Sequence, residues 1–313
     1  MGLAQHIEIA SSGSLLLRLP VEAHAMARAA SLDLDGCTLR RKRELHVTLL
    51  DADATSRVTA AIGRPRLLEL ARAQTWRITR GGDGAIMIDR KRRRCSLVEW
   101  IELPAFARLR EALGQASGSH LPATLPHITQ YASDAKGIGL PDIAGIERLR
   151  AGSLRLPGVC NRTPGDDPAQ VRAEYRDGCS LLAPGVVARL GEASEAVDRW
   201  LEEHRAMSAL LFSAADPFGT DASPCGNAVR WQLLDALLEA NGIRAVAVAG
   251  KEDEGEPARL SACLLDPGDS ASDVLLRDYE QLAAVRVQRG RAPTLLLHPA
   301  LRAREAATTG DTS

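Results

Sequence analysis

Two short segments of the chain carry the same pattern and limit how it can fold. Residues 45–49 contain His46 and Thr48, residues 126–130 contain His127 and Thr129, and each pair is separated by one β-branched residue. Successive side chains of a strand point to opposite faces, so each segment predicts a strand with His and Thr on one face. Seven His and fourteen Thr give roughly 0.3 such triplets by chance in a chain of this length. Two unrelated strand histidines are the simpler alternative.

The residue types of the two motifs suit phosphate chemistry. If the strands lie side by side, two imidazoles and two hydroxyls converge on one small space. A neutral His46 or His127 could then take a proton while the other, protonated, gives one. Thr48 and Thr129 would hydrogen-bond the non-bridging phosphate oxygens. This arrangement requires no metal and no cofactor, and the spacing of the motifs suggests neither.

The first half of the chain resembles the 2H phosphoesterase superfamily, which includes RNA 2′,3′-cyclic phosphodiesterases, also called 2′-5′ RNA ligases. The resemblance rests on the two His-x-Thr motifs, 81 residues apart, and on a strand-like stretch at 14–20 followed by a helix-like stretch at 21–30. It covers about residues 10–157, with Gln130 as a departure from the usual small or apolar residue. It implies catalytic His46 and His127, phosphate-binding threonines, and a 2′,3′-cyclic phosphate of an RNA end or small nucleotide as substrate.

Basic and aromatic residues near the motifs are candidates for binding such a substrate. A basic run at 40–43 precedes the first motif, and a denser one at 90–94 precedes an apolar stretch. Tyr131 shares the predicted strand face of His127 and could stack on a base. Solvated turns and core packing are the alternatives for these residues. The possible substrate-binding residues are Tyr131, Arg41, Arg43, Arg92 and Arg94.

The charge of the chain is unevenly distributed. The formal net charge is −1, yet residues 1–155 hold 23 Lys and Arg against 16 Asp and Glu, which leaves 16 and 24 in the remainder. A half with net charge +7 that carries the motif pair suits a polyanionic ligand. Scattered, solvated arginines would give the same count. The chain has no apolar run of eighteen residues, no signal-peptide pattern and no clustered cysteines, so we expect a cytoplasmic protein that does not enter a membrane.

The pattern of elements predicts an α+β protein, with a two-lobed antiparallel-sheet domain followed by a smaller α/β domain. In the first domain, the glycines at 81–84 predict the turn of a hairpin, and residues 104–116 predict a helix. In the second, a helix is predicted from about Ser223 to Asn241. We expect a catalytic domain at 1–157, a linker and connecting helix at 158–207, the small domain at 208–302 and a flexible tail at 303–313. The small domain resembles a bacterial domain family of unknown function. The matching residues are Ala215, Asp216, Pro217, Asn227, Arg230, Gly242, Gly250, Tyr279, Glu280 and Gln281.

Taken together, the sequence predicts a metal-independent phosphodiesterase that opens 2′,3′-cyclic phosphates of RNA ends or small nucleotides. A non-catalytic RNA- or nucleotide-binding protein is one alternative, and 2′-5′ joining of RNA ends by the reverse reaction is another. The second domain could recruit a partner of unknown kind. The sequence leaves open the natural substrate, the acid and base roles of the two histidines, and the oligomeric state.

Overall fold

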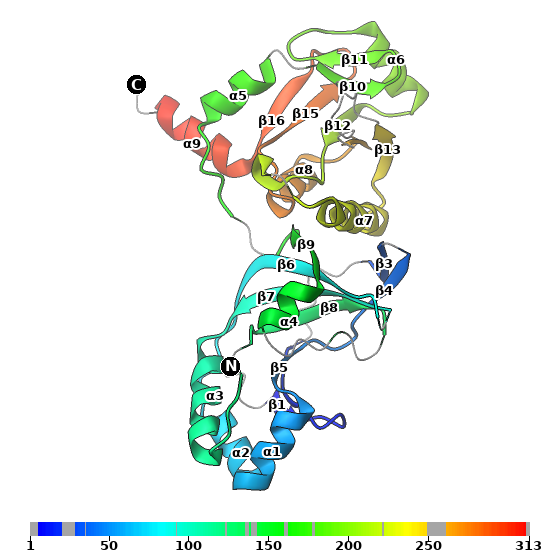
Figure 1. Cartoon of the computed structure of the whole chain (residues 1–313). Helices are drawn as coiled ribbons and strands as arrows, with labels where there is room; N and C mark the ends of the chain where they lie inside the picture. Colours follow the sequence, from blue (N-terminus) through cyan, green and yellow to red (C-terminus); the bar gives the residue numbers. More distant parts are fainter. Residues whose placement is uncertain are drawn as a thin grey trace. The chain divides into compact units, whose positions relative to one another are not determined.

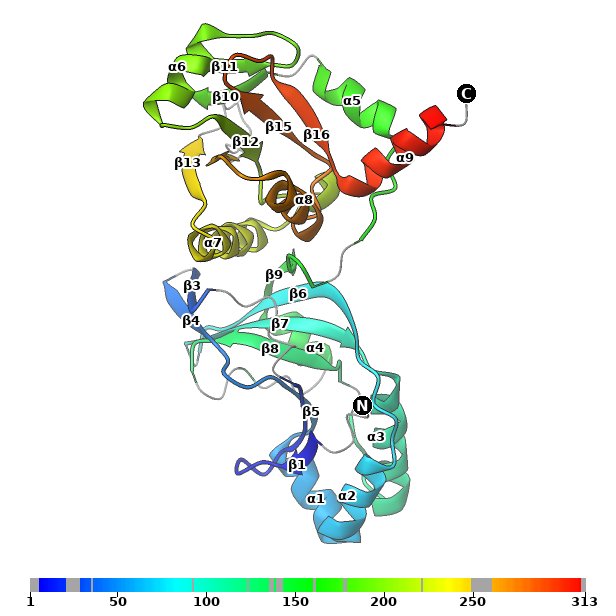
Figure 2. The same cartoon turned by 180° about the vertical axis from the view of Figure 1, so that it is seen from behind.

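The chain is a mixed α/β protein with antiparallel sheets and divides into two compact units (Figures 1 and 2). The computed structural model describes residues 6–20, 29–34, 36–91, 93–122, 124–134, 138, 143–159, 162–176, 179–220, 222–248 and 261–310. Unit 1 comprises residues 1–159 with 223–229, and unit 2 comprises 160–222 with 230–313. The predicted first boundary, after residue 157, lies two residues before the division after Val159.

Unit 1 is built on a nine-stranded sheet. Its central path runs β1-β2-β5-β8-β7-β6-β9, and β4 joins β8 while pairing with β3. The strands are β1 (Ile7–Ile9), β2 (Leu15–Arg18), β3 (Ser31–Leu34), β4 (Cys37–Arg41), β5 (His46–Leu50), β6 (Thr79–Asp89), β7 (Arg94–Glu102), β8 (His127–Ala132) and β9 (Arg150–Arg155). The helices are α1 (Ala52–Ile62), α2 (Arg64–Arg72), α3 (Pro104–Ser117) and α4 (Ile143–Leu149).

The helices of unit 1 begin and end where the sequence supplies caps. The Asp51 carboxylate accepts a hydrogen bond from the Ala54 amide at 2.7 Å, which caps α1. Helix α3 begins at a proline and ends at Gly118, whose φ of 66° is the left-handed conformation that glycine adopts readily. Figure 1 shows α1, α2 and α3 grouped together. They share one core with β1, β2, β5 and β8, in which Val47 and Ile128 are fully buried.

The hairpin of β6 and β7 differs from the sequence-based expectation. The glycine-rich stretch at 81–84 predicts a turn between two short strands, but β6 runs without interruption from Thr79 to Asp89. The ladder with β7 instead shifts register between Arg80 and Gly84, and the described turn residues Arg90, Lys91 and Arg93 follow the end of β6. Glycines inside a strand commonly mark such an irregularity or a close backbone approach. The prediction of a turn at these glycines is therefore wrong.

Unit 2 contains a five-stranded antiparallel sheet in the order β13-β14-β12-β15-β16 and a separate two-stranded sheet of β10 and β11. Its strands are β10 (Cys179–Ala183), β11 (Val186–Arg189), β12 (Ser208–Phe212), β13 (Arg244–Val248), β14 (Ser261–Leu265), β15 (Ala283–Gln288) and β16 (Thr294–Leu297). The helices are α5 (Pro168–Arg176), α6 (Glu195–Glu203), η3 (Pro217–Gly219), α7 (Pro224–Ala240), α8 (Asp269–Asp278) and α9 (Pro299–Gly310), and the first residues of α7 belong to unit 1.

Helices cover both faces of the five-stranded sheet. On one face β10, β11 and α6 pack through Leu182, Val197 and Trp200 against β12, β14 and β15. On the other face α7 and α8 pack through Leu234 and Leu276 (Figures 1 and 2). Successive side chains of each strand point to opposite faces of the sheet, and both faces are apolar. Each face must therefore be covered by another element.

Two predicted boundaries of unit 2 require correction. Residues 158–207 were expected to be a linker with a connecting helix, but they supply α5, β10, β11 and α6, which pack into the core of unit 2. Residues 303–313 were expected to be a flexible tail, but α9 extends to Gly310. The buried Leu301 anchors its first turn, and Arg172 of α5 forms a paired ion contact with Glu305.

Candidate functional site

The two His-x-Thr strands are neighbours in the sheet of unit 1. Strands β5 and β8 are antiparallel and pair Val47 with Ile128. This register sets His46 opposite Thr129 and Thr48 opposite His127, with all four side chains on the face away from Val47 and Ile128. The two imidazoles are diagonal neighbours, whose backbones lie about 7–8 Å apart. The register therefore brings the four motif side chains together on one face of the sheet.

The next strands outward add one residue on each side of the four motif residues. On β2, Arg18 lies opposite His46, and on β7, Trp100 lies opposite His127. The Trp100 and His127 rings meet edge to face, with centroids 5.9 Å apart. Sequence analysis did not single out Arg18 or Trp100. The alternation of β2 and the pairing of β7 with β8 would have been needed to find them.

His46 lies in a surrounding that disfavours its protonated form. Burial is the main cause and the positive charges of Arg18 and Lys42 add to it, lowering the pKa of His46 from 6.5 to about 4. Its Nδ1 is buried and makes no hydrogen bond with any described residue. In the charged form both ring nitrogens carry a proton. The proton on Nδ1 would then have no hydrogen-bond acceptor among the described residues, which further disfavours the charged form. His46 is consequently neutral near pH 7.

His127 differs from His46 in having a fixed ring. Its Nδ1 lies 3.0 Å from the Leu125 carbonyl oxygen. A carbonyl only accepts, so Nδ1 carries the proton and Nε2 is the nitrogen that gains or loses one. Burial lowers the pKa of His127, and the bond to Leu125 opposes that shift. The two imidazoles are thus distinct in both orientation and environment.

The threonines and a neighbouring hollow complete the site. Thr48 and Thr129 are half-buried and form no side-chain hydrogen bond with the described residues, so their hydroxyls can bind a ligand. A hollow of about 590 Å³ adjoins His46. Its lining among the described residues is Arg18, Arg40, Arg41, Lys42, Arg43, Glu44, His46, Ala132, Ser133 and Asp134.

The predicted substrate-binding residues lie in different surroundings. Arg41 and Arg43 line the hollow, whereas Arg94 forms an ion pair with Asp134 at 2.8 Å and is not among the lining residues. Arg92 lies outside the described residues. Tyr131 is 2% exposed and its hydroxyl donates to the Ala29 carbonyl, so its ring is not presented to a base. The predicted stacking role of Tyr131 is therefore wrong.

Gln130 is explained by the opposite face of β8. Its side-chain amide donates to the buried Glu99 carboxylate at 2.7 Å, and Arg80 binds the same carboxylate through two hydrogen bonds. A buried carboxylate needs such partners, because an uncompensated charge inside a protein is costly. The unusual residue next to the second motif therefore supports the sheet and does not enter the site.

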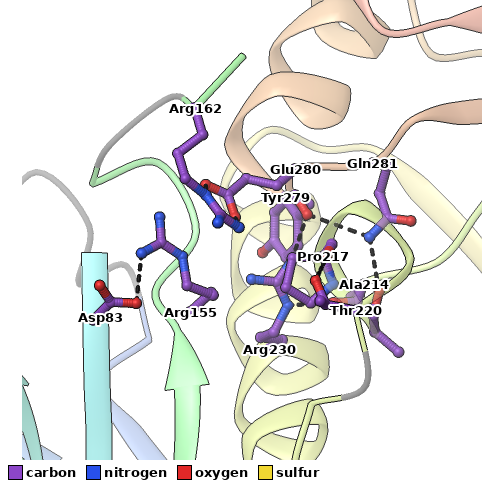
Figure 3. Close-up of polar contacts among 11 residues, drawn as sticks. Asp83, Arg155, Arg162, Ala214, Pro217, Thr220, Arg230, Tyr279, Glu280 and Gln281 are labelled. Atoms are coloured by element: carbon purple, nitrogen blue, oxygen red, sulfur yellow. Dashed lines mark hydrogen bonds and ion pairs between the residues drawn. The ribbon is translucent and has the colours of Figure 1, made fainter. Parts of the chain in front are cut away.

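Five of the residues that carry the resemblance of unit 2 lie close together in a structural network: Pro217, Arg230, Tyr279, Glu280 and Gln281 (Figure 3). Gly250 lies outside the described residues. Arg230 is fully buried and donates to the Ala214 and Tyr279 carbonyls, and Gln281 donates to the Ala215 carbonyl. Asp216 has a φ of 43°, a conformation that Asn and Asp tolerate better than most residues. Arg230 therefore holds two loops together and offers no surface to an anion.

Within the described part of the chain, no cluster of three or more His, Cys, Asp or Glu side chains is arranged to hold a metal ion. A search of the same residues finds no helix that combines the length and apolar character needed to cross a membrane. Comparison with family models, with curated proteins and with solved structures finds no match to this chain.

Proposed function

We propose that unit 1 is a phosphodiesterase that opens 2′,3′-cyclic phosphates with His46 and His127, in the manner of the 2H phosphoesterases that its sequence resembles. The observation that carries the proposal is the register of β5 and β8, which sets each motif histidine opposite the threonine of the other motif. The fold assigned to unit 1 under this proposal is the two-lobed antiparallel sheet of that superfamily.

The chemistry follows from four side chains around one phosphorus atom. One neutral imidazole accepts a proton from water as its oxygen bonds to phosphorus. The bond from phosphorus to one ribose oxygen breaks, and the other imidazole, protonated, delivers its proton to that oxygen. The product is a phosphomonoester with a free ribose hydroxyl. Thr48 and Thr129 donate hydrogen bonds to the non-bridging oxygens, whose negative charge grows in the transition state.

The positive surroundings of His46 support an anionic substrate. Arg18 lies directly across the ladder from His46, and Lys42 is close enough to lower its pKa. A bound phosphate compensates these charges, so it favours protonation of one imidazole at the moment when a general acid is needed. A neutral ligand would leave both histidines unprotonated near pH 7 and the acid role unfilled.

The test is hydrolysis of an oligonucleotide that ends in a 2′,3′-cyclic phosphate, with EDTA present. We expect the wild type to turn over and His46→Ala and His127→Ala each to lose at least about 100-fold in kcat, the low end of general acid–base contributions. His120→Ala is the matched control, since His120 is exposed in the same unit. Either motif variant retaining full activity, or a wild type that binds without turnover, would contradict the proposal.

A further inference from the structure

The hollow beside His46 contains a dense run of cations that the four motif residues do not use. Arg40, Arg41, Lys42 and Arg43 follow one another from the end of β4 into the connection to β5, and all four line the hollow. Its volume of about 590 Å³ falls within the roughly 300–1,000 Å³ typical of small-molecule sites. The hollow therefore has room for a group beyond the phosphate that reacts.

The sheet fixes the distance between this run and the reacting centre. Along β8, Thr129 lies opposite His46, and Tyr131 lies opposite Arg41 of β4. The pairing of β7 with β8 shifts register between Thr129 and Tyr131. The rows of His46 and Arg41 therefore lie at most about 7 Å apart along β8, the full advance of two residues of a regular strand. This separation is comparable with the distance between successive phosphates of a single-stranded nucleic acid.

The net charge of the hollow is positive. Its lining includes two carboxylates, Glu44 and Asp134. Glu44 forms an ion pair with Arg18, and Asp134 forms one with Arg94. Asp134 also attracts Lys42. The hollow nevertheless keeps a net positive charge, because Arg18 and the four cations at 40–43 outnumber its two carboxylates. Arg40 and Arg43 are exposed and are open to a ligand from solvent.

We infer that residues 40–43 form a subsite for the phosphodiester that directly precedes the cyclic phosphate, so that the substrate class is an oligonucleotide and not a cyclic mononucleotide. This inference rests on the proposed function for the position of the cyclic phosphate. In a strand with a terminal 2′,3′-cyclic phosphate, the adjacent phosphate is attached to the 5′ oxygen of the same terminal nucleoside. A cyclic mononucleotide lacks that phosphate and leaves the subsite empty.

The test compares a 2′,3′-cyclic mononucleotide with a dinucleotide that ends in the same nucleoside 2′,3′-cyclic phosphate. We expect the wild-type kcat/KM to be at least about 10-fold higher for the dinucleotide. Arg40→Gln combined with Arg43→Gln should remove most of that preference, measured as the ratio of the two kcat/KM values for the same variant. The matched control combines Arg57→Gln with Arg108→Gln, two exposed arginines of unit 1 that do not line the hollow. Equal wild-type values, or an unchanged preference in the Arg40 and Arg43 variant, would overturn the subsite and leave the proposed function standing.

A binding measurement separates the subsite from catalysis. The probes are a 3′-phosphorylated dinucleotide and the corresponding 3′-mononucleotide, titrated at several salt concentrations. For the dinucleotide, the Arg40 and Arg43 variant should lose about 0.7 from the slope of log K against log salt, the value for one neutralised phosphate of a single strand. Differential binding without turnover in any assay would refute the phosphodiesterase and retain the subsite. Equal binding of both probes would refute the subsite.

Discussion

The charge of the His127 imidazole acts on His46 together with the charges of Arg18 and Lys42, so protonation of His127 disfavours protonation of His46. Burial, with Arg18 and Lys42, lowers the pKa of His46 to about 4, and burial also places the pKa of His127 below its ordinary 6.5. The active form of the proposed enzyme carries one proton on the pair. Its kcat/KM therefore rises through the lower pKa of the pair and falls through the upper one, whichever imidazole is the base.

We therefore expect the kcat/KM profile to be bell-shaped with its maximum between about pH 4 and 6.5. Arg18→Gln removes a positive charge beside His46, raises its pKa and moves the acid limb to higher pH. Arg57→Gln, at an exposed position of α1, should leave the profile unchanged. A maximum above pH 7, or an acid limb that does not respond to Arg18→Gln, would contradict this account.

The motif residues could be identified from the sequence because their chemistry and their two-residue spacing are both local. Arg18 and Trp100 could not, since only the pairing of β2 with β5 and of β7 with β8 brings them to the site. Tyr131 illustrates the converse error. Strand alternation predicts that it shares the face of His127, but the register shift of β8 against β7 pairs it with Leu97, next to the Val98 that faces Thr129. Its hydroxyl contact with the Ala29 carbonyl depends on a residue about one hundred positions away.

At the scale of elements, the sequence located most helices and strands where caps and periodicity agree, as at α3 and α7. The exception is β6, where a group of glycines resembles a turn. The Cβ of an alanine at Gly84 would lie 2.7 Å from the Val98 carbonyl oxygen. Gly84 is therefore required by the close approach of β7, a reason that lies in a different strand.

Replacing Gly84 should destabilise unit 1 by roughly 1–3 kcal/mol, because the added methyl group has no space between β6 and β7. Gly81 lies in the same strand, and a Cβ there meets only the Asp83 carboxylate at 3.6 Å. Gly81→Ala should be neutral or slightly stabilising. Chemical denaturation of Gly84→Ala and Gly81→Ala, followed by circular dichroism, measures both. Equal effects would show that the close approach does not determine the choice of glycine.

The corrections at 158–207 and 303–313 have a common cause. Helical spacing at Val197 and Leu201 correctly indicates a helix, which the structure shows as α6. The remaining elements of both stretches depend on distant partners for their structure. Strand β11 is only four residues long and pairs with β10, and α9 is held by α5 through Arg172 and Glu305. Local sequence patterns do not carry the contacts that stabilise such elements, so composition alone suggested a linker and a tail.

At the scale of the whole molecule, each unit contains a histidine whose burial disfavours its protonated form. In unit 2, His298 is 3% exposed and accepts a hydrogen bond from the Ala300 amide. Burial, with the positive charges of Arg277, Arg302 and Arg304 and against that of Asp273, lowers the pKa of His298 to about 4. In the unfolded chain this side chain binds a proton near pH 6.5, and in the folded chain only near pH 4. The stability that neutral His298 contributes is therefore fully present above pH 6.5 and decreases as the pH falls toward 4.

His298→Asn keeps a side-chain acceptor for the Ala300 amide and removes the titration. We expect this variant to lose less stability than the wild type between pH 6.5 and 4, by on the order of 3 kcal/mol. Thermal melts across that range measure the slope, and His120→Asn at an exposed site of unit 1 is the control. Identical pH slopes for the wild type and His298→Asn would argue against a neutral buried His298.

The pairing of Val47 with Ile128 constrains the site in a way that the number of residues between the two motifs does not. The number of residues between the motifs can change through insertions in loops without moving either histidine. A shift of one residue in this pairing, however, would turn the imidazole and the hydroxyl of one strand into the core. The number of residues between the motifs can therefore change in related sequences, whereas the register of β5 and β8 cannot. The two buried aliphatic side chains, Val47 and Ile128, impose this constraint.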